Sequence, residues 1–277
     1  MFKFSGCNKC FRTFPRTSFG SKRDFSGFAT DTWEKRTNKL HRTHADSVRF
    51  ARYQTELNAV VCNTGAKYSV LFQLPYYDAV RFVIIDPAHN LFLGLAKTTL
   101  KVWQENELIK DKHFDLLQRR VDAVIPPPEI GRIPSKISTR FSGFTADQWK
   151  NWVCYYSAFA LKGILPREHY DAWMCFVTAC RLIGCQSIRM AQCSETESRI
   201  IEFCKHFERL CGTETCILNI HLSCHLVDCI RDYGPFWCFS FKIYNGILGS
   251  YHKNNHNIGK WLSYMCSSVL SPGVHNL

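Results

Sequence analysis

The sequence predicts a mainly α-helical fold. Apolar residues recur at three- and four-residue intervals through several long stretches after residue 40, which is the spacing of one helix face. Strand candidates are few and short, such as Val83-Ile84-Ile85. Hydrophobic residues make up 46% of the 277 residues, enough to bury an ordinary core in one large or two small domains. No run approaches the roughly 18 apolar residues of a membrane-spanning helix, so we expect a globular protein and no membrane partner.

The first part of the chain is expected to be a loop region followed by a helix. Residues 1–40 combine Gly, Ser, Phe and basic residues around the pair Cys7 and Cys10, a composition typical of loops. The helical pattern then extends over 44–63, and Gly65 stands where a C-terminal cap belongs.

A second helix is predicted over 86–103. Asp86 suits its N-cap, and Pro87 suits its first turn, where the missing N–H costs nothing. The apolar residues of this helix are expected in the core: Leu91, Leu95, Leu100 and Val102.

A proline-rich loop at 126–140 is the strongest candidate for an internal boundary, because its prolines and Gly131 interrupt regular structure. Four helices are predicted after it, with Thr145 as the N-cap of the first and Pro166 in the first turn of the second. Their ranges are 145–161, 166–182, 195–211 and 220–233. The tryptophans are assigned to packing instead of base stacking, because they lie beside apolar neighbours at helical spacing: Trp149, Trp152, Trp173 and Trp237.

The charge of the chain makes polyanions plausible partners. The formal net charge is +12, and the first 60 residues hold 12 Lys and Arg against 5 Asp and Glu. DNA binding by charge needs no sequence recognition, because each phosphate contact releases counterions. Many basic proteins bind no nucleic acid in their function, so charge alone leaves this open. The 15 cysteines without an N-terminal signal peptide indicate reduced thiols and a nuclear or cytoplasmic protein.

Two short motifs have the spacing of metal half-sites. Cys7 and Cys10 are separated by two residues, which lets both thiolates reach one tetrahedral zinc ion. His221 and His225 lie one helical turn apart, although Cys224 could replace either of them. The alternative is a helix with two surface histidines beside unrelated buried cysteines.

Other chemistry is less marked. Asp86 and His89 are an acid and an imidazole three residues apart, but a helix cap explains Asp86, and His89 could face a metal, DNA or solvent. The sequence contains no glycine-rich phosphate loop, no Gly-x-Ser-x-Gly elbow and no His-Glu-x-x-His, so common hydrolase and kinase classes are not indicated.

Several distinctive segments follow one another along the chain. The most specific are Ile85-Asp86-Pro87-Ala88-His89-Asn90-Leu91-Phe92-Leu93-Gly94, Gly131-Arg132-Ile133-Pro134-Ser135-Lys136-Ile137 and Gly143-Phe144-Thr145-Ala146-Asp147-Gln148-Trp149-Lys150-Asn151-Trp152. They are accompanied by Gly6-Cys7-Asn8-Lys9-Cys10, Asp24-Phe25-Ser26-Gly27-Phe28, Leu74-Pro75-Tyr76-Tyr77-Asp78 and Tyr244-Asn245-Gly246. Taken in their order along the chain, these segments resemble the CACTA/EnSpm transposases of animal and fungal mobile elements. The resemblance covers nearly the whole chain to about Asn255.

The resemblance implies a ribonuclease-H-like α/β nuclease core interrupted by a helical insertion domain. Active relatives hold two Mg²⁺ ions on three carboxylates and use them for strand cleavage and transfer. The chain would then comprise the knuckle and basic loop region at 1–40, the insertion at 41–125 and 141–218 around the 126–140 loop, a core remnant with the histidine pair and catalytic helix at 219–255, and a divergent tail at 256–277. The resemblance also implies that Cys7 and Cys10 share one structural zinc ion with His221 and His225.

The departures from the family indicate an inactive protein. The family's first two catalytic aspartates precede the cysteine pair, but the six residues before Cys7 in this sequence contain no aspartate. The family's third acid, in the motif that contains Asn245, is replaced by Lys242. A lysine there would repel the metal ions. We expect a truncated, transposase-derived protein without catalytic activity that binds DNA electrostatically. The alternatives are a domesticated zinc-stabilised module that binds DNA or a protein, and a homo-oligomer in which another copy supplies the acids.

Overall fold

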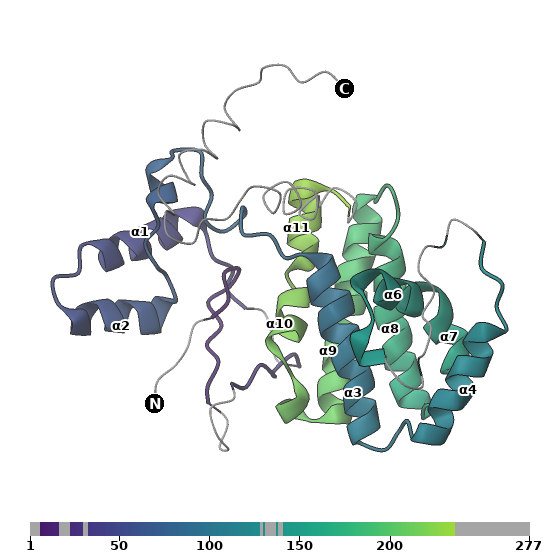
Figure 1. Cartoon of the computed structure of the whole chain (residues 1–277). Helices are drawn as coiled ribbons and strands as arrows, with labels where there is room; N and C mark the ends of the chain where they lie inside the picture. The colour runs from purple at the N-terminus through teal and green to yellow at the C-terminus, as the bar shows by residue number, and fades with distance from the viewer. Residues whose placement is uncertain are drawn as a thin grey trace, which may run out of the picture. The chain divides into compact units, whose positions relative to one another are not determined.

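The computed structural model describes residues 6–16, 23–29, 33–127, 130, 137 and 141–235, all within one compact unit, Met1–Trp237. Their regular elements are helices, and the described residues before α1 add two isolated antiparallel bridges. The prediction of a mainly α fold is therefore confirmed (Figure 1). The ribonuclease-H-like remnant stays a prediction. Trp237, Lys242, Asn245 and the tail at 256–277 lie outside the described residues.

The helix predicted over 44–63 is two helices. Helix α1 spans Asn38–Arg49 and begins at the N-cap Thr37, whose hydroxyl accepts from the Leu40 N–H. Helix α2 spans Gln54–Thr64 and ends at Gly65, which has a positive φ of 68° as expected for its cap. The break between them carries no Gly or Pro. It is stabilised locally, because the Glu56 carboxylate accepts from the Arg52 backbone N–H before the second helix begins.

The chain then passes through a 3₁₀ turn, η1, at Val70–Gln73 and an irregular segment at 83–85. The strand predicted at 83–85 is wrong, since this segment forms no ladder with any described residue. It instead leads directly into η2, a π-helix at Ala88–Ala96 that continues as α3 at Lys97–Glu105. Asp86 accepts from the Ala88 N–H at 3.0 Å, which confirms its capping role. The predicted core residues of this helix are all buried: Leu91, Leu95, Leu100 and Val102.

The helices between residues 111 and 211 form a bundle around an aromatic core. Its members are α4 at Asp111–Asp122, α6 at Ala146–Asn151, the π-helix η4 at Trp152–Tyr156, α7 at Ser157–Ala160, α8 at Arg167–Ile183 and α9 at Met190–Cys211. Helices α8 and α9 lie side by side (Figure 1). Trp173 of α8 packs on Trp103 of α3 with ring centroids 5.2 Å apart, and Phe176 of α8 packs on Phe203 of α9 at 5.0 Å.

Capping and burial in the bundle follow the sequence predictions. Thr145 caps α6 in a box with Gln148, and Pro166 directly precedes α8. Trp149, Trp152 and Trp173 are fully buried, as their assignment to packing requires. Burial of such large rings supplies most of the hydrophobic stabilisation of a bundle.

The helix predicted over 220–233 is also two helices. Helix α10 spans Leu218–Ser223 and α11 spans Leu226–Tyr233, and the backbone turns at His225, with φ −104° and ψ 0°. Helix α10 packs on η2, where the Asn90 side chain donates to the Asn219 backbone carbonyl at 2.9 Å.

Gly94 makes this packing close. A Cβ built at Gly94 would lie 2.3 Å from the Asn219 side-chain nitrogen and 2.9 Å from the His89 carbonyl oxygen. We therefore expect Gly94→Ala to lower the free energy of unfolding by about 1–3 kcal/mol in urea denaturation. Gly143→Ala is the matched control, because no atom lies within 4 Å of its Cβ position. Equal effects of the two substitutions would contradict the close approach of η2 and α10.

Candidate metal centre

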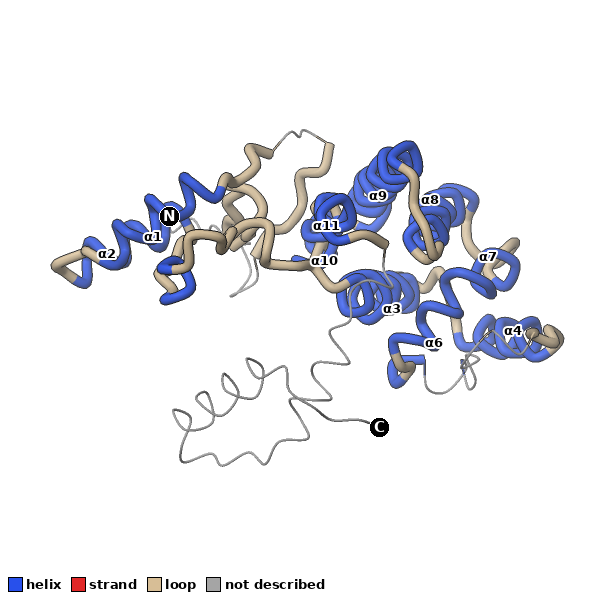
Figure 2. The backbone as a smooth tube through the Cα atoms, turned by 90° about the horizontal axis from the view of Figure 1, so that it is seen from above, coloured by secondary structure: helices blue, strands red, loops and turns tan. Residues whose placement is uncertain are grey.

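The described part of the N-terminal segment before α1 is an irregular loop (Figure 2), and it contains the knuckle formed by Cys7 and Cys10. The Lys9 backbone N–H donates to the Cys7 sulfur at 3.3 Å, and Cys10 forms an antiparallel bridge with Lys35. The buried Arg36 guanidinium donates from Nε to the carbonyl oxygens of Cys7 at 2.8 Å and Cys10 at 2.9 Å. One arginine thus fixes both ends of the knuckle, so that both sulfur atoms are held in place.

Aromatic packing and hydrogen bonds hold the knuckle against the C-terminal helices. The rings of Phe14 and Trp33 pack on His221, with centroid distances of 4.9 and 4.3 Å. On α9, the Glu208 carboxylate accepts from the backbone N–H groups of Gly27 and Phe28 at 2.9 and 2.8 Å. These contacts bring the described residues of the N-terminal loop onto α9 and α10, and these residues form no helix before α1.

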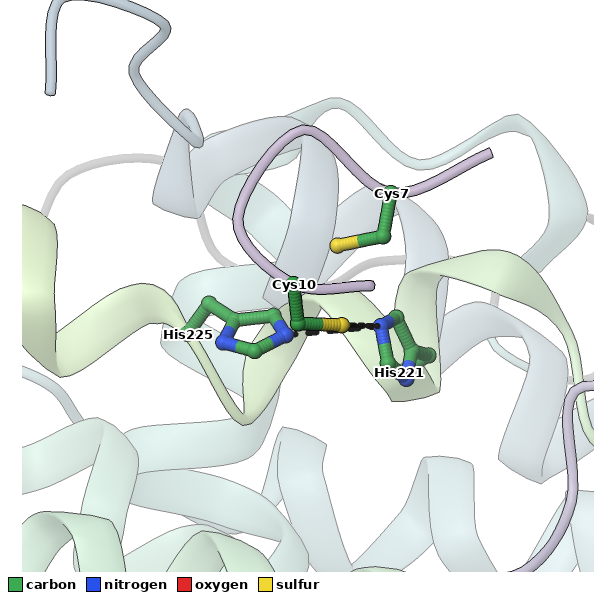
Figure 3. A group of neighbouring side chains, drawn as sticks. All are labelled: Cys7, Cys10, His221 and His225. Atoms are coloured by element: carbon green, nitrogen blue, oxygen red, sulfur yellow. Dashed lines mark hydrogen bonds between the residues drawn. The ribbon is translucent and has the colours of Figure 1, made fainter. Parts of the chain in front are cut away.

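Four side chains with metal-binding atoms converge in this place: Cys7, Cys10, His221 and His225. All four are buried, and their ligand atoms lie within 4.8 Å of one another (Figure 3). The Cys10 sulfur lies 3.4 Å from His221 Nε2, and the two Nε2 atoms are 3.4 Å apart. Two nitrogen ligands at about 2.05 Å from a tetrahedral zinc ion are about 3.3 Å apart, so the spacing fits one ion between these residues.

The protonation of the cluster also suits a metal. The hydrogen bond from Cys10 lowers the pKa of the Cys7 thiol, while burial opposes that shift. The same hydrogen bond and burial raise the pKa of Cys10. Burial lowers the pKa of His221. A thiolate and a neutral imidazole are the ligand forms, and a bound cation would hold the second thiol in its thiolate form. The buried cluster could therefore bind a metal such as zinc.

The backbone break at His225 selects the ligands. It turns the His225 ring toward His221, whereas the Cys224 sulfur lies 3.9 Å from the Cys204 sulfur and 3.8 Å from the Ile220 carbonyl oxygen. Cys224 therefore belongs to the packing between α9 and α10. The alternative of two surface histidines is wrong, because His221 and His225 are both buried.

The other residues singled out in the sequence lie in different surroundings. Asp86 contacts the Nδ1 atom of His89, whose side chain is 70% exposed. Asn90 is buried and bonds to Asn219, and Trp149 is a core residue. A pocket of about 450 Å³ is bordered by Asp86, His89 and Asn90. Its other lining residues are Asn8 and Lys9 of the knuckle, Val83, Ile84 and Ile85 before η2, and Asn219 and Leu222 of α10. The structure thus groups three of the motif residues beside the knuckle and separates Trp149 from them.

The sequence did not predict the role of three residues that support the centre. Arg36 binds the knuckle backbone, Trp33 packs on the His221 ring, and Glu208 binds the loop backbone at Gly27. None of these three residues is part of a spacing pattern. The only signal for Arg36 and Trp33 is their position in the basic, aromatic segment that follows the cysteine pair.

Comparisons with known proteins give no match: no family model, no curated protein and no solved structure matches this chain. Among the described residues, none of the helices combines the length and apolar character that crossing a membrane would require. The functional argument therefore depends on the geometry of the site and on the sequence.

Zinc binding can be tested by substitution within the cluster. The Cys7→Ser, His225→Ala double variant should lose one equivalent of zinc relative to the wild-type chain, measured by elemental analysis of purified protein. Cys224→Ser is the matched control and should keep its zinc, since the Cys224 sulfur lies against Cys204. Loss of zinc in this control, or retention in the double variant, would contradict the ligand assignment.

The metal-free chain should lose stability on acidification. Burial lowers the pKa of His41, His44 and His169 below the ordinary value of 6.5. The unfolded chain therefore binds more protons than the folded chain as the pH falls through about 6.5, which favours unfolding. Urea denaturation with a chelator present should give a lower free energy of unfolding at about pH 5.5 than at about pH 7.5. His41→Gln should reduce this difference, and a stability that rises on acidification would refute the prediction.

Proposed function

We propose that this chain is a non-cleaving module derived from a CACTA/EnSpm-type transposase. In this proposal, zinc on Cys7, Cys10, His221 and His225 fastens the N-terminal segment to the helical bundle. The assembled module binds DNA through its positive charge. The observation that carries the proposal is the meeting of these four ligands, whose halves stand at opposite ends of the described chain.

The ligand set supports the transposase origin because the resemblance implies this same pairing. Spacing within each half-site does not specify which other half-site completes it, and the chain has 15 cysteines and 11 histidines to choose from. The cluster unites the cysteine pair and the histidine pair that the family relationship would join. A structural role fits the site, because two cysteines and two histidines fill all four positions of a tetrahedral ion and leave none open for a substrate.

The absence of cleavage rests on Lys242. In the family motif this position holds the glutamate that binds the catalytic metal ions, and an ammonium group there opposes binding of a divalent cation. DNA binding rests on the net charge of +12, which favours phosphate contacts that need no base recognition.

A domesticated module with a host role is the second candidate, and the closed cluster favours it over a decayed fragment. Loss of any one of the four ligands would open the site, and loss of Arg36 or Glu208 would release the loop that carries the cysteines. Such a module would use the same zinc-held surface to bind DNA or a protein partner.

The proposal predicts DNA binding without DNA cutting. The purified zinc-loaded chain should bind duplex DNA with an affinity that falls at least about ten-fold between roughly 50 and 200 mM salt in fluorescence anisotropy. Supercoiled plasmid should stay intact with Mg²⁺ or Mn²⁺. The Cys7→Ser, His225→Ala variant serves as the control for dependence on the zinc-held fold. Metal-dependent nicking that disappears when a single carboxylate of this chain is replaced would overturn the proposal.

A further inference from the structure

The exposed apolar side chains of the described residues gather in one part of the chain. Helix α2 has no buried residue, and α1 and α2 make their main helix contacts with each other. More than half of the large hydrophobic side chains exposed in the described residues lie between 40 and 82: Leu40, Phe50, Tyr53, Val70, Leu71, Tyr76 and Phe82. A concentration of this kind on a soluble domain marks a binding surface more often than a packing defect.

Aromatic rings in this region form a continuous row. Its rings are Phe50, Tyr68, Phe72, Tyr77 and Phe82, and successive rings from Tyr68 onward have centroids 5.9, 6.0 and 5.5 Å apart. The Arg49 guanidinium joins Phe50 to the row, because it lies 5.2 Å from the Phe50 ring and 4.7 Å from the Tyr68 ring. None of the five rings is buried, and those at the two ends are 69% and 46% exposed. We call this set the aromatic row.

The segment that carries the aromatic row also carries exposed cations, and one of them, Arg49, contacts two of its rings. Lys39, Arg49, Arg52 and Lys67 are all exposed, and none of their side-chain nitrogens forms an ion pair with a carboxylate among the residues that the structure describes. The core of a protein interface is depleted in charged groups, especially lysine. Aromatic rings interleaved with unpaired cations are instead the combination that binds a nucleic acid strand, with rings for the bases and cations for the phosphates.

We propose that the aromatic row binds single-stranded DNA. The faces of bases are accessible to side chains only when the strand is unpaired and unstacked, whereas a duplex offers phosphates and groove edges. Phe50 and Phe82 are the stacking positions, and the Arg49 guanidinium can lie against a base while it neutralises a phosphate. This inference rests on the proposed DNA-binding function and adds to it the surface and the state of the strand.

The test compares a single-stranded oligothymidine with a duplex of the same length by fluorescence anisotropy at matched salt. The wild-type chain should bind the single strand more tightly. The Phe50→Ala, Phe82→Ala double variant should weaken binding of the single strand by at least about ten-fold, because each stacked base contributes appreciably, and change duplex binding less than about two-fold. Tyr155→Ala, Phe159→Ala is the matched control, since these rings are also exposed, at 49% and 39%, but belong to the helical bundle.

A second variant guards against effects on folding. Arg49→Lys keeps the charge on an exposed position but removes the planar group, so it should weaken single-strand binding and leave its salt dependence unchanged. Duplex binding with no preference for the single strand, or single-strand binding that neither variant weakens, would overturn this inference and leave the proposed function standing. No binding of either DNA at low salt would overturn both. A wild-type dimer that becomes a monomer in the Phe50→Ala, Phe82→Ala variant would assign the row to a second copy of this chain.

Discussion

The fold depends on the closure of the N-terminal knuckle onto α10, which joins residues 211 positions apart in the chain. The described residues of the loop that carries Cys7 and Cys10 form only two isolated bridges and no helix, so contacts to other elements supply much of its order. Arg36 holds the knuckle turn, Glu208 holds the loop behind it, and the two histidines supply the far side of the site. A metal ion here would offset the entropy of ordering the loop, because its binding free energy becomes part of the folding free energy.

Local signals in the sequence predicted the core and two of the helix starts, whereas the starts expected at 44 and 195 are wrong, since α1 begins at Asn38 and α9 at Met190. The caps at Asp86 and Thr145 are explicit in residue type and spacing, and the tryptophans and the apolar face of η2 and α3 occupy the core positions that their periodicity indicates. The same reasoning failed at the two helix breaks. Neither 50–53 nor 224–225 contains Gly or Pro, and each break is set by contacts that periodicity does not encode, such as the Glu56 carboxylate on the Arg52 N–H.

Residue spacing predicted the two halves of the candidate site, but it did not predict that these two halves come together. Each half-site is visible in the sequence as a pair of ligands. Which pairs meet depends on how η2 packs on α10 and how Phe14 and Trp33 cover His221, and these are long-range contacts. The family resemblance implied the pairing, His225 included. Spacing alone left Cys224 open, and the backbone turn at His225 places the Cys224 sulfur against Cys204 instead.

The wide separation of the two half-sites has a consequence for synthesis in the cell. At a translation rate of roughly 5–20 residues per second, the 211 residues between Cys10 and His221 take roughly 10–40 s to appear after the cysteine pair. Throughout that interval His221, His225 and Leu222, which packs against the two cysteines, have not yet been synthesised. The two thiols of the nascent chain therefore depend on a reducing environment until α10 and α11 leave the ribosome.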